Sequence, residues 1–263
     1  MAKSVAEVQF QAIAKTSEIW KLVSSIIMTI VDEAYFEAGS KGLTLRSMDP
    51  SHIALIDLSW PSSAFEKYDC PSTIKFGLRI SDFAKIIKRS NSNDSVEIGL
   101  KDSSLTIRTA GGYVRTYKMN LLASGNENVS PVPKLTFDSK FVLGASVLDR
   151  IFSDIQVISE NISIETTVGK KSVTFGGTND SSNCTVILDD KSRTEENKLQ
   201  EVTVKENSKS TYNMDYISKI LKIISSASDI LTLEYSSKKP IRLEFGLLNA
   251  VWVQFFLAPR VDR

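Results

Sequence analysis

The feature that most constrains this 263-residue chain is an internal repeat. Three segments of the first half have counterparts in the second half, in the same order and at nearly one displacement. The matched pairs are 19–26 with 148–155, 43–45 with 173–175, and 81–88 with 215–222. Because self-similarity at a fixed period indicates duplicated structural units, the sequence predicts two copies of one domain of about 130 residues.

Each copy is predicted to contain two helices and many antiparallel strands. The helical segments carry apolar side chains at i, i+3, i+4 and i+7, with Thr16 or Ser17 available to cap the first helix and Ser81 the second. The predicted helices are 16–31, 81–90, 145–158 and 214–226. Apolar residues alternate in twos at 42–46, 95–100, 231–235 and 241–245, which is typical of strands. The predicted fold class is therefore α+β.

Residues 122–134 are rich in Gly, Asn, Ser and Pro, which favours an extended connection between the copies. The predicted boundaries are an N-terminal domain at 1–121, an interdomain connector at 122–134 and a C-terminal domain at 135–263. Residues 189–210 are dense in charge and are predicted to form a solvated loop with one strand at 202–204.

Composition excludes several classes of protein. Apolar residues make up 42% and charged residues 24%, which is ordinary for a globular chain. With only Cys70, Cys184 and one histidine, His52, the chain has neither a disulfide framework nor a Cys/His zinc site, so no metal or cofactor is expected. The most apolar run, 22–31, is too short to span a bilayer, and the N-terminus lacks a secretory signal. We expect a soluble intracellular protein.

Catalytic motifs are weak. Residues 168–172 resemble the end of a phosphate-binding loop, but the first glycine is missing and Lys171 stands where Ser or Thr is needed. Asp49 could pair with His52, yet no Gly-x-Ser-x-Gly nucleophile motif is present. The sequence therefore predicts a non-enzymatic protein, with a hydrolase that uses Asp49 and His52 as the alternative.

Basic residues recur on equivalent helix faces. Lys85, Lys88 and Arg89 lie opposite the apolar stripe of one predicted helix, and Lys219 and Lys222 do the same in its counterpart. One such helix alone is explained by a solvated lysine face. The repetition in a chain of net charge +1 favours attraction of phosphates without sequence preference.

Three segments carry a resemblance to a known family. They are Leu45-Arg-Ser-Met-Asp-Pro-Ser-His-Ile-Ala-Leu55, Pro131-Val-Pro-Lys-Leu-Thr-Phe137 and Phe256-Leu-Ala-Pro-Arg-Val261. Together, in this order and spacing, they are similar to the DNA sliding clamps of the proliferating cell nuclear antigen family. The resemblance implies the DNA clamp fold, with three subunits closed head-to-tail into a ring, helices lining the hole and strands forming the outer wall.

The resemblance also implies which residues face DNA and which join subunits. The implied DNA-facing residues are Lys21, Lys85, Lys88, Arg89, Arg150, Lys219 and Lys222. Met28, Ser153 and Val157 stand where further basic residues are expected, which puts contacts through the first helix of each copy in doubt. Subunits are expected to join by pairing of edge strands at 112–120 and 182–189. The implied interface residues are Tyr113, Arg115, Tyr117, Cys184, Val186 and Leu188.

The implied function is a ring around duplex DNA that makes a DNA polymerase processive and recruits partners through a hydrophobic pocket. The implied pocket residues are Met48, His52, Ile53, Leu55, Val132, Phe137, Pro240, Phe256, Ala258, Pro259 and Val261. The implied partners are duplex DNA, DNA polymerase, the clamp loader replication factor C, flap endonuclease, DNA ligase and two further copies of the chain, with no membrane. The protein would lie with the chromosome, in the nucleus where there is one and otherwise in the cytoplasm. Alternatives are a subunit of a hetero-trimeric or checkpoint-type clamp, and a plain DNA-binding module.

Overall fold

The computed structural model describes residues 9–123, 135–191 and 199–260, which group into two units. The first unit takes in the described residues up to Pro50, those of Ile56–Val129, and Leu247–Trp252. The second takes in Ser51–Leu55, the described residues of Ser130–Gly246, and those after Trp252. Two short segments thus belong with the unit opposite to the one that their sequence position predicts. Of the predicted connector, only Leu122 and Ala123 lie within the described residues.

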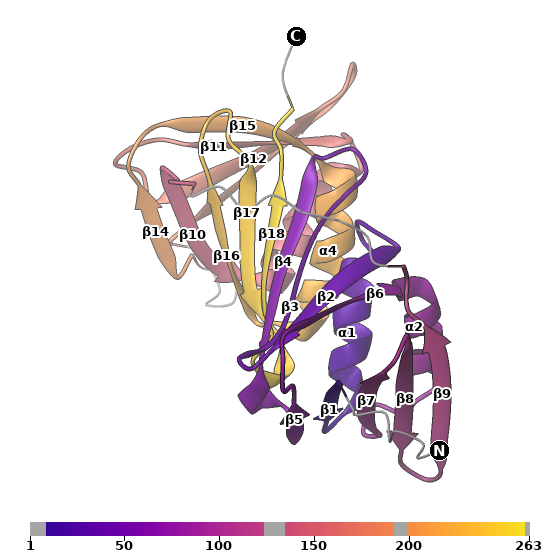
Figure 1. The fold of residues 1–263 in the computed structure, drawn as a ribbon. Coiled ribbons are helices and arrows are strands. Elements are labelled where there is room, and N and C mark those ends of the chain that lie inside the picture. Colours follow the sequence, from indigo (N-terminus) through magenta and orange to yellow (C-terminus); the bar gives the residue numbers. More distant parts are fainter. Residues whose placement is uncertain (1–8, 124–134, 192–198, 261–263) are drawn as a thin grey trace, which may run out of the picture. The chain divides into compact units, whose positions relative to one another are not determined.

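The first unit contains two helices and two groups of antiparallel strands (Figure 1). Its strands follow the orders β5-β1-β7-β8-β9 and β4-β3-β2-β6. Its elements are β1 Phe10–Ala14, α1 Ser17–Ile27, β2 Glu33–Gly39, β3 Gly42–Met48, β4 Ala54–Pro61, β5 Lys67–Asp69, β6 Ile74–Arg79, α2 Ile80–Lys88, β7 Ser95–Lys101, β8 Ser104–Ala110 and β9 Val114–Asn120.

The second unit repeats this plan. Its strands follow the orders β14-β10-β16-β17-β18 and β13-β12-β11-β15. Its elements are β10 Ser139–Gly144, α3 Ala145–Gln156, β11 Asn161–Thr166, β12 Ser172–Thr178, β13 Asn183–Asp189, β14 Glu201–Val204, β15 Ser208–Asn213, α4 Met214–Ala227, β16 Ile230–Tyr235, β17 Ile241–Gly246 and β18 Trp252–Leu257.

The internal repeat is confirmed by the order and the pairing of these elements. Helices and strands alternate identically along both units, apart from short 3-10 turns. The antiparallel pair β1–β7 corresponds to β10–β16, and β2–β6 corresponds to β11–β15. Helix α1 lies against α2 in the first unit, as α3 lies against α4 in the second. The predicted α+β class and the strand within the charged segment, β14, are therefore correct.

The helices follow the predicted apolar stripes, but six of their eight ends differ from the predicted ends by one to four residues. Helix α1 ends at Ile27 rather than residue 31. Helix α2 begins at Ile80, so Ser81 lies inside its first turn and is not the N-cap. Asp32 instead accepts hydrogen bonds from two amides of the first turn. Its backbone carbonyl accepts from the Ile80 N–H at 2.6 Å, and its Oδ1 accepts from the Ser81 N–H at 3.0 Å. This cap comes from a distant loop, so local sequence does not reveal it.

Each unit buries its own apolar core. In the first, the rings of Trp20 and Trp60 lie 4.7 Å apart between centroids, and Phe65 stacks on Trp60 at 4.4 Å. In the second, Phe152 of α3 meets Phe175 of β12 edge to face. Alternate residues of most strands are buried, as the two-residue periodicity predicts. No helix in the described ranges combines the length and apolarity needed to cross a membrane.

Candidate functional site

Exposed basic side chains lie on the solvent-facing sides of three helices. On α2 the apolar residues Phe83 and Ile87 are buried, whereas Lys85 and Lys88 are exposed. The exposed cations of this set are Lys85, Lys88, Arg89, Arg150, Lys219 and Lys222. Lys85 pairs with Asp82 at 2.9 Å, but both side chains are largely solvated, so this ion pair contributes little. These six residues form the basic helix faces.

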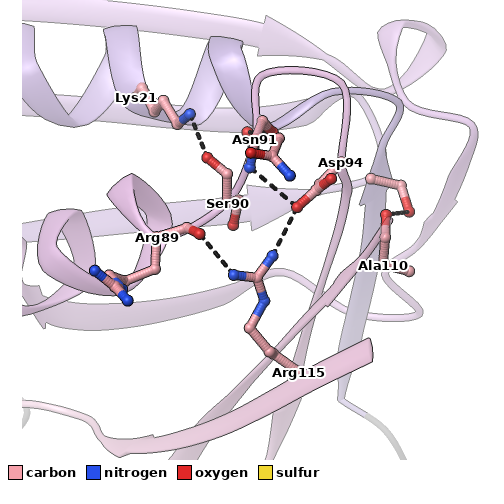
Figure 2. A network of polar contacts seen from close by, with 9 residues as sticks. Lys21, Arg89, Ser90, Asn91, Asp94, Ala110 and Arg115 are labelled. Atoms are coloured by element: carbon pink, nitrogen blue, oxygen red, sulfur yellow. Dashed lines mark hydrogen bonds and ion pairs between the residues drawn. The ribbon is translucent and has the colours of Figure 1, made fainter. Parts of the chain in front are cut away.

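Lys21 differs from the other predicted DNA-facing residues. Its side chain is half-buried on α1, and its Nζ donates a hydrogen bond of 2.6 Å to the backbone oxygen of Ser90 (Figure 2). Ser90 follows the last turn of α2, so this ammonium caps the carboxyl end of the neighbouring helix. Lys21 is therefore held by its own chain, which the sequence did not indicate.

The first helix of each unit exposes uncharged side chains where basic residues were expected. Met28 follows α1 and is 39% exposed, and Val157 follows α3 and is 86% exposed. Ser153 is exposed on α3. The exposed cations consequently lie mainly on α2 and α4.

Strands β9 and β13 each end a sheet, as the sequence predicted for edge strands. Tyr113, next to β9, is 67% exposed, and Ile187 of β13 is 65% exposed. Among the predicted interface residues, Leu188 is buried, whereas Tyr117, Cys184 and Val186 are half-buried. Within the described residues no strand pairs with the outer side of either one, which suits pairing with a strand of another chain.

Arg115 of β9 is engaged within its own chain (Figure 2). Its Nη2 donates to Asp94 Oδ2 at 2.7 Å, and its Nη1 donates to the backbone oxygen of Arg89 at 2.6 Å. Asp94 and Ser90 were missed by sequence reasoning because they lie in a short polar turn that carries no motif. Only the fold brings that turn to β9.

Several residues of the predicted peptide pocket lie within the described part of the second unit. Ile53 is 39% exposed, and its backbone oxygen accepts a hydrogen bond of 2.8 Å from the N–H of Ala258. His52 is exposed and has a left-handed backbone, with φ of 58°. The structure thus brings 52–53 beside 258, two of the predicted segments. Val132 and Val261 lie outside the described residues.

The remaining predicted pocket residues differ in exposure. Leu55, Phe137 and Phe256 are buried, whereas Pro240, Ala258 and Pro259 are half-buried. The guanidinium of Arg242 lies 5.1 Å from the centre of the Phe137 ring. Met48 is half-buried and belongs to the first unit. Among the pocket residues that the structure describes, Ile53 is the most exposed apolar side chain.

Asp49 and His52, on which the alternative prediction of a hydrolase depends, differ in solvent exposure. Asp49 is buried, and His52 is exposed. Within the described ranges, no group of three or more His, Cys, Asp or Glu side chains could hold a metal ion.

Comparisons with known proteins cover nearly all of the chain. Residues 9–111 match the family model of the proliferating cell nuclear antigen N-terminal domain, and 131–260 match that of its C-terminal domain. A protein of Nitrosopumilus maritimus named DNA polymerase sliding clamp is 41% identical over 96% of this chain and 99% of its own length. A protein of the same name from Cenarchaeum symbiosum is 39% identical over 96% of this chain and 99% of its own length.

Solved structures agree on the fold. The clamp of Thermococcus kodakaraensis superposes with a TM-score of 0.87 at 23% identity and covers 95% of this chain and 100% of that one. A clamp of A. fulgidus, solved with the C-terminal region of FEN-1, gives a TM-score of 0.85 at 24% identity, with 97% and 99% covered. The duplicated fold, the two open edge strands and these matches lead to one conclusion: the chain belongs to the proliferating cell nuclear antigen family.

Proposed function

We propose that the protein is a DNA polymerase sliding clamp, a ring that encircles duplex DNA and keeps a polymerase on its template. The observation that carries this proposal is the 41% identity, over 96% of the chain, to a protein of that name. A closed ring stays on DNA because of its topology, so it needs no tight or sequence-specific contact. It also recruits replication and repair enzymes, and it acts at the chromosome.

The ring is a homotrimer joined by strand pairing between β9 of one subunit and β13 of the next. Both strands end their sheets, and pairing them removes exposed backbone donors and acceptors that otherwise favour aggregation. A head-to-tail contact closes into a ring when its rotation divides the circle. Three copies of the 29.1 kDa chain make the particle.

The basic helix faces bind the phosphates of the encircled duplex. Lysine and arginine side chains that neutralise phosphates act without sequence preference and release counterions, so binding weakens as salt rises. Exposed ammonium groups on α2 and α4 are suited to such weak contacts. Lys21 serves mainly to hold α2, since its Nζ is bonded to Ser90.

Partner proteins dock through short peptides on the pocket around Ile53 and Ala258. The backbone bond between these residues holds the two segments together, and the Ile53 side chain, which is 39% exposed, offers an apolar contact. The clamp of A. fulgidus was solved with the C-terminal region of FEN-1, which supports flap endonuclease as one such partner. DNA polymerase, DNA ligase and the clamp loader are further partners of the same class.

The experiment compares retention on two forms of one plasmid. The purified protein is loaded by its clamp loader onto nicked circular DNA, and half of the sample is then cut once with a restriction enzyme. Rings should stay on the circle for many minutes and run off the linear form. Equal retention on both forms would identify a plain DNA-binding module. Light scattering of the free protein should give three times 29.1 kDa, and a persistent monomer would indicate a mixed ring of different chains.

A further inference from the structure

The carboxyl end of α2 is held by side chains from two distant elements (Figure 2). A helix leaves its last carbonyl groups without intrahelical partners, and cations near this end are favourable. Here the carbonyl oxygens of the C-cap residue and of the two residues that follow it each accept a bond of 2.6 Å. The bonds are Ser17 Oγ to Asn91 O, Lys21 Nζ to Ser90 O, and Arg115 Nη1 to Arg89 O. Helix α1 and strand β9 therefore both hold the end of α2.

Asp94 is the acidic centre of this network. Its carboxylate is almost fully buried and accepts from Arg115 Nη2 at 2.7 Å and from the Asn91 N–H at 3.0 Å. Gly111 leaves the space that the carboxylate fills, since a Cβ there would lie 2.0 Å from Asp94 Oδ1. A buried ion pair is strongly disrupted when one partner is lost, because the other charge stays buried without compensation.

Arg115 is suited to this place by its shape. The planar guanidinium donates in two directions at once, to Asp94 and to the Arg89 carbonyl, which a lysine ammonium does not reproduce in fixed geometry. The Tyr113 ring covers the guanidinium at 4.6 Å. Only 17% of the Arg115 side chain is exposed. Both terminal nitrogens of the guanidinium therefore bond within the chain, while the buried Nε has no hydrogen-bond partner among the described residues.

We propose that Arg115 is a positioning residue: it ties the edge strand β9 to the carboxyl end of α2, so that the strand that joins subunits and the helix that faces DNA move as one body. This inference rests on the proposed function, in which β9 pairs with a neighbouring subunit and α2 faces the duplex. Arg115 thus acts through Asp94 and the Arg89 carbonyl, and not by touching the next subunit.

The test measures the trimer dissociation constant by mass photometry during dilution, for Asp94→Asn, Arg115→Met and the double variant. Asp94 is buried and lies outside β9, so it has no direct route to a neighbouring subunit. Asp94→Asn and Arg115→Met should each raise the dissociation constant by about tenfold or more. The double variant should be no worse than the poorer single variant, because both changes break the same interaction. Arg115→Lys should be intermediate.

DNA retention supplies the second readout. At concentrations where the variant rings remain closed, Asp94→Asn should also shorten retention on nicked circular DNA, because the end of α2 that carries Lys88 and Arg89 is held less firmly through the Arg89 carbonyl. Two controls separate this effect from a general loss of stability. Arg108→Met removes an exposed arginine from the neighbouring strand β8, and Ile98→Val trims a buried side chain of β7 outside the network. Both should behave like the wild type.

The outcomes distinguish this inference from the proposed function. If Arg115→Met weakens the trimer while Asp94→Asn has no effect, Arg115 is a direct subunit contact and the positioning role is refuted. If Ile98→Val weakens the trimer as much as Asp94→Asn, the effect is general destabilisation, and the inference again fails. In both cases wild-type rings on circular DNA leave the proposed function intact. A wild type that never assembles by itself overturns the proposed homotrimer and this inference with it, while retention on circular DNA still tests the clamp function separately.

Discussion

Buried hydroxyl groups form a polar network inside the second unit. The Tyr235 hydroxyl donates to Thr166 Oγ1 at 2.9 Å and lies 3.3 Å from the Ser208 carbonyl, while Ser139 and Thr166 share a bond of 2.8 Å. The residues of this network belong to β16, β11, β15 and β10, so the network links four strands. Burial raises the pKa of Tyr235 well above its ordinary value, and burial raises the pKa of Tyr68 in the first unit to about 12.

These raised pKa values predict a loss of stability at high pH. The stabilisation is fully present below the ordinary tyrosine pKa of about 10 and is lost as the pH rises through the folded pKa, because the unfolded chain ionises first. Tyr235→Phe should lower the unfolding free energy at pH 8 by about 1–3 kcal/mol, since it leaves buried partners unsatisfied. It should also make the decline above pH 10 shallower, by up to about 1.4 kcal/mol per pH unit.

Urea unfolding at a fixed protein concentration, between pH 8 and pH 11, measures both effects. Tyr113→Phe removes the hydroxyl of an exposed tyrosine and should leave the unfolding free energy at pH 8 unchanged. A Tyr235→Phe variant with the same alkaline decline as the wild type would show that this hydroxyl is not the group that titrates.

At the scale of the elements, the sequence predicted the features that depend on local periodicity, namely the helices and their repetition. The apolar stripes predicted all four helices, and the repeat predicted that α1 and α2 correspond to α3 and α4. The predicted start of α2 was wrong because the helix is capped by Asp32. This residue precedes β2, and β2 pairs with β6, the strand that leads into α2. The Asp94–Arg115 pair was missed for the same reason, since its partners lie 21 residues apart in separate elements. Contacts between distant elements leave no periodic trace.

The cap on α2 gives a prediction at this scale. Asp32→Ala removes the side-chain acceptor for the Ser81 N–H and should cost about 1 kcal/mol of unfolding free energy. Asp32→Asn keeps an acceptor oxygen and should cost only a few tenths of that amount. Ser81→Ala should be nearly neutral, because Ser81 lies inside the helix. Urea unfolding of the three variants decides the matter, and a Ser81→Ala loss equal to that of Asp32→Ala would restore Ser81 as the cap.

At the scale of the whole molecule, the placement of charge matters more than its total. The chain carries 32 basic and 31 acidic residues, so the net charge of +1 says little about DNA. The sequence identified the basic helix faces because the same pattern recurs in both copies. It could not show that Lys21 is bonded to Ser90, because that contact depends on the packing of α1 against α2.

Two matched variants separate charge placement from net charge. The first replaces Lys85, Lys88, Lys219 and Lys222 of the helices with Ala, and the second replaces Lys75, Lys101, Lys171 and Lys209 of the strands and turns. Each removes four exposed lysines and changes the net charge from +1 to −3. Only the helix variant should lose retention on circular DNA. The slope of its log DNA affinity against log salt should be shallower by about 0.9 for each phosphate contact removed.

The measurement is the half-life of loaded rings on nicked circular DNA between low and physiological salt. Because screening is weakest at low salt, the difference between the two variants should be largest there. Both variants should still form rings of wild-type mass, since none of the eight lysines lies in β9 or β13. If the two variants lose retention equally, net charge governs binding and the basic helix faces are only solvated surfaces. A selective loss in the helix variant means that the duplicated fold places phosphate contacts on matching helices of both units.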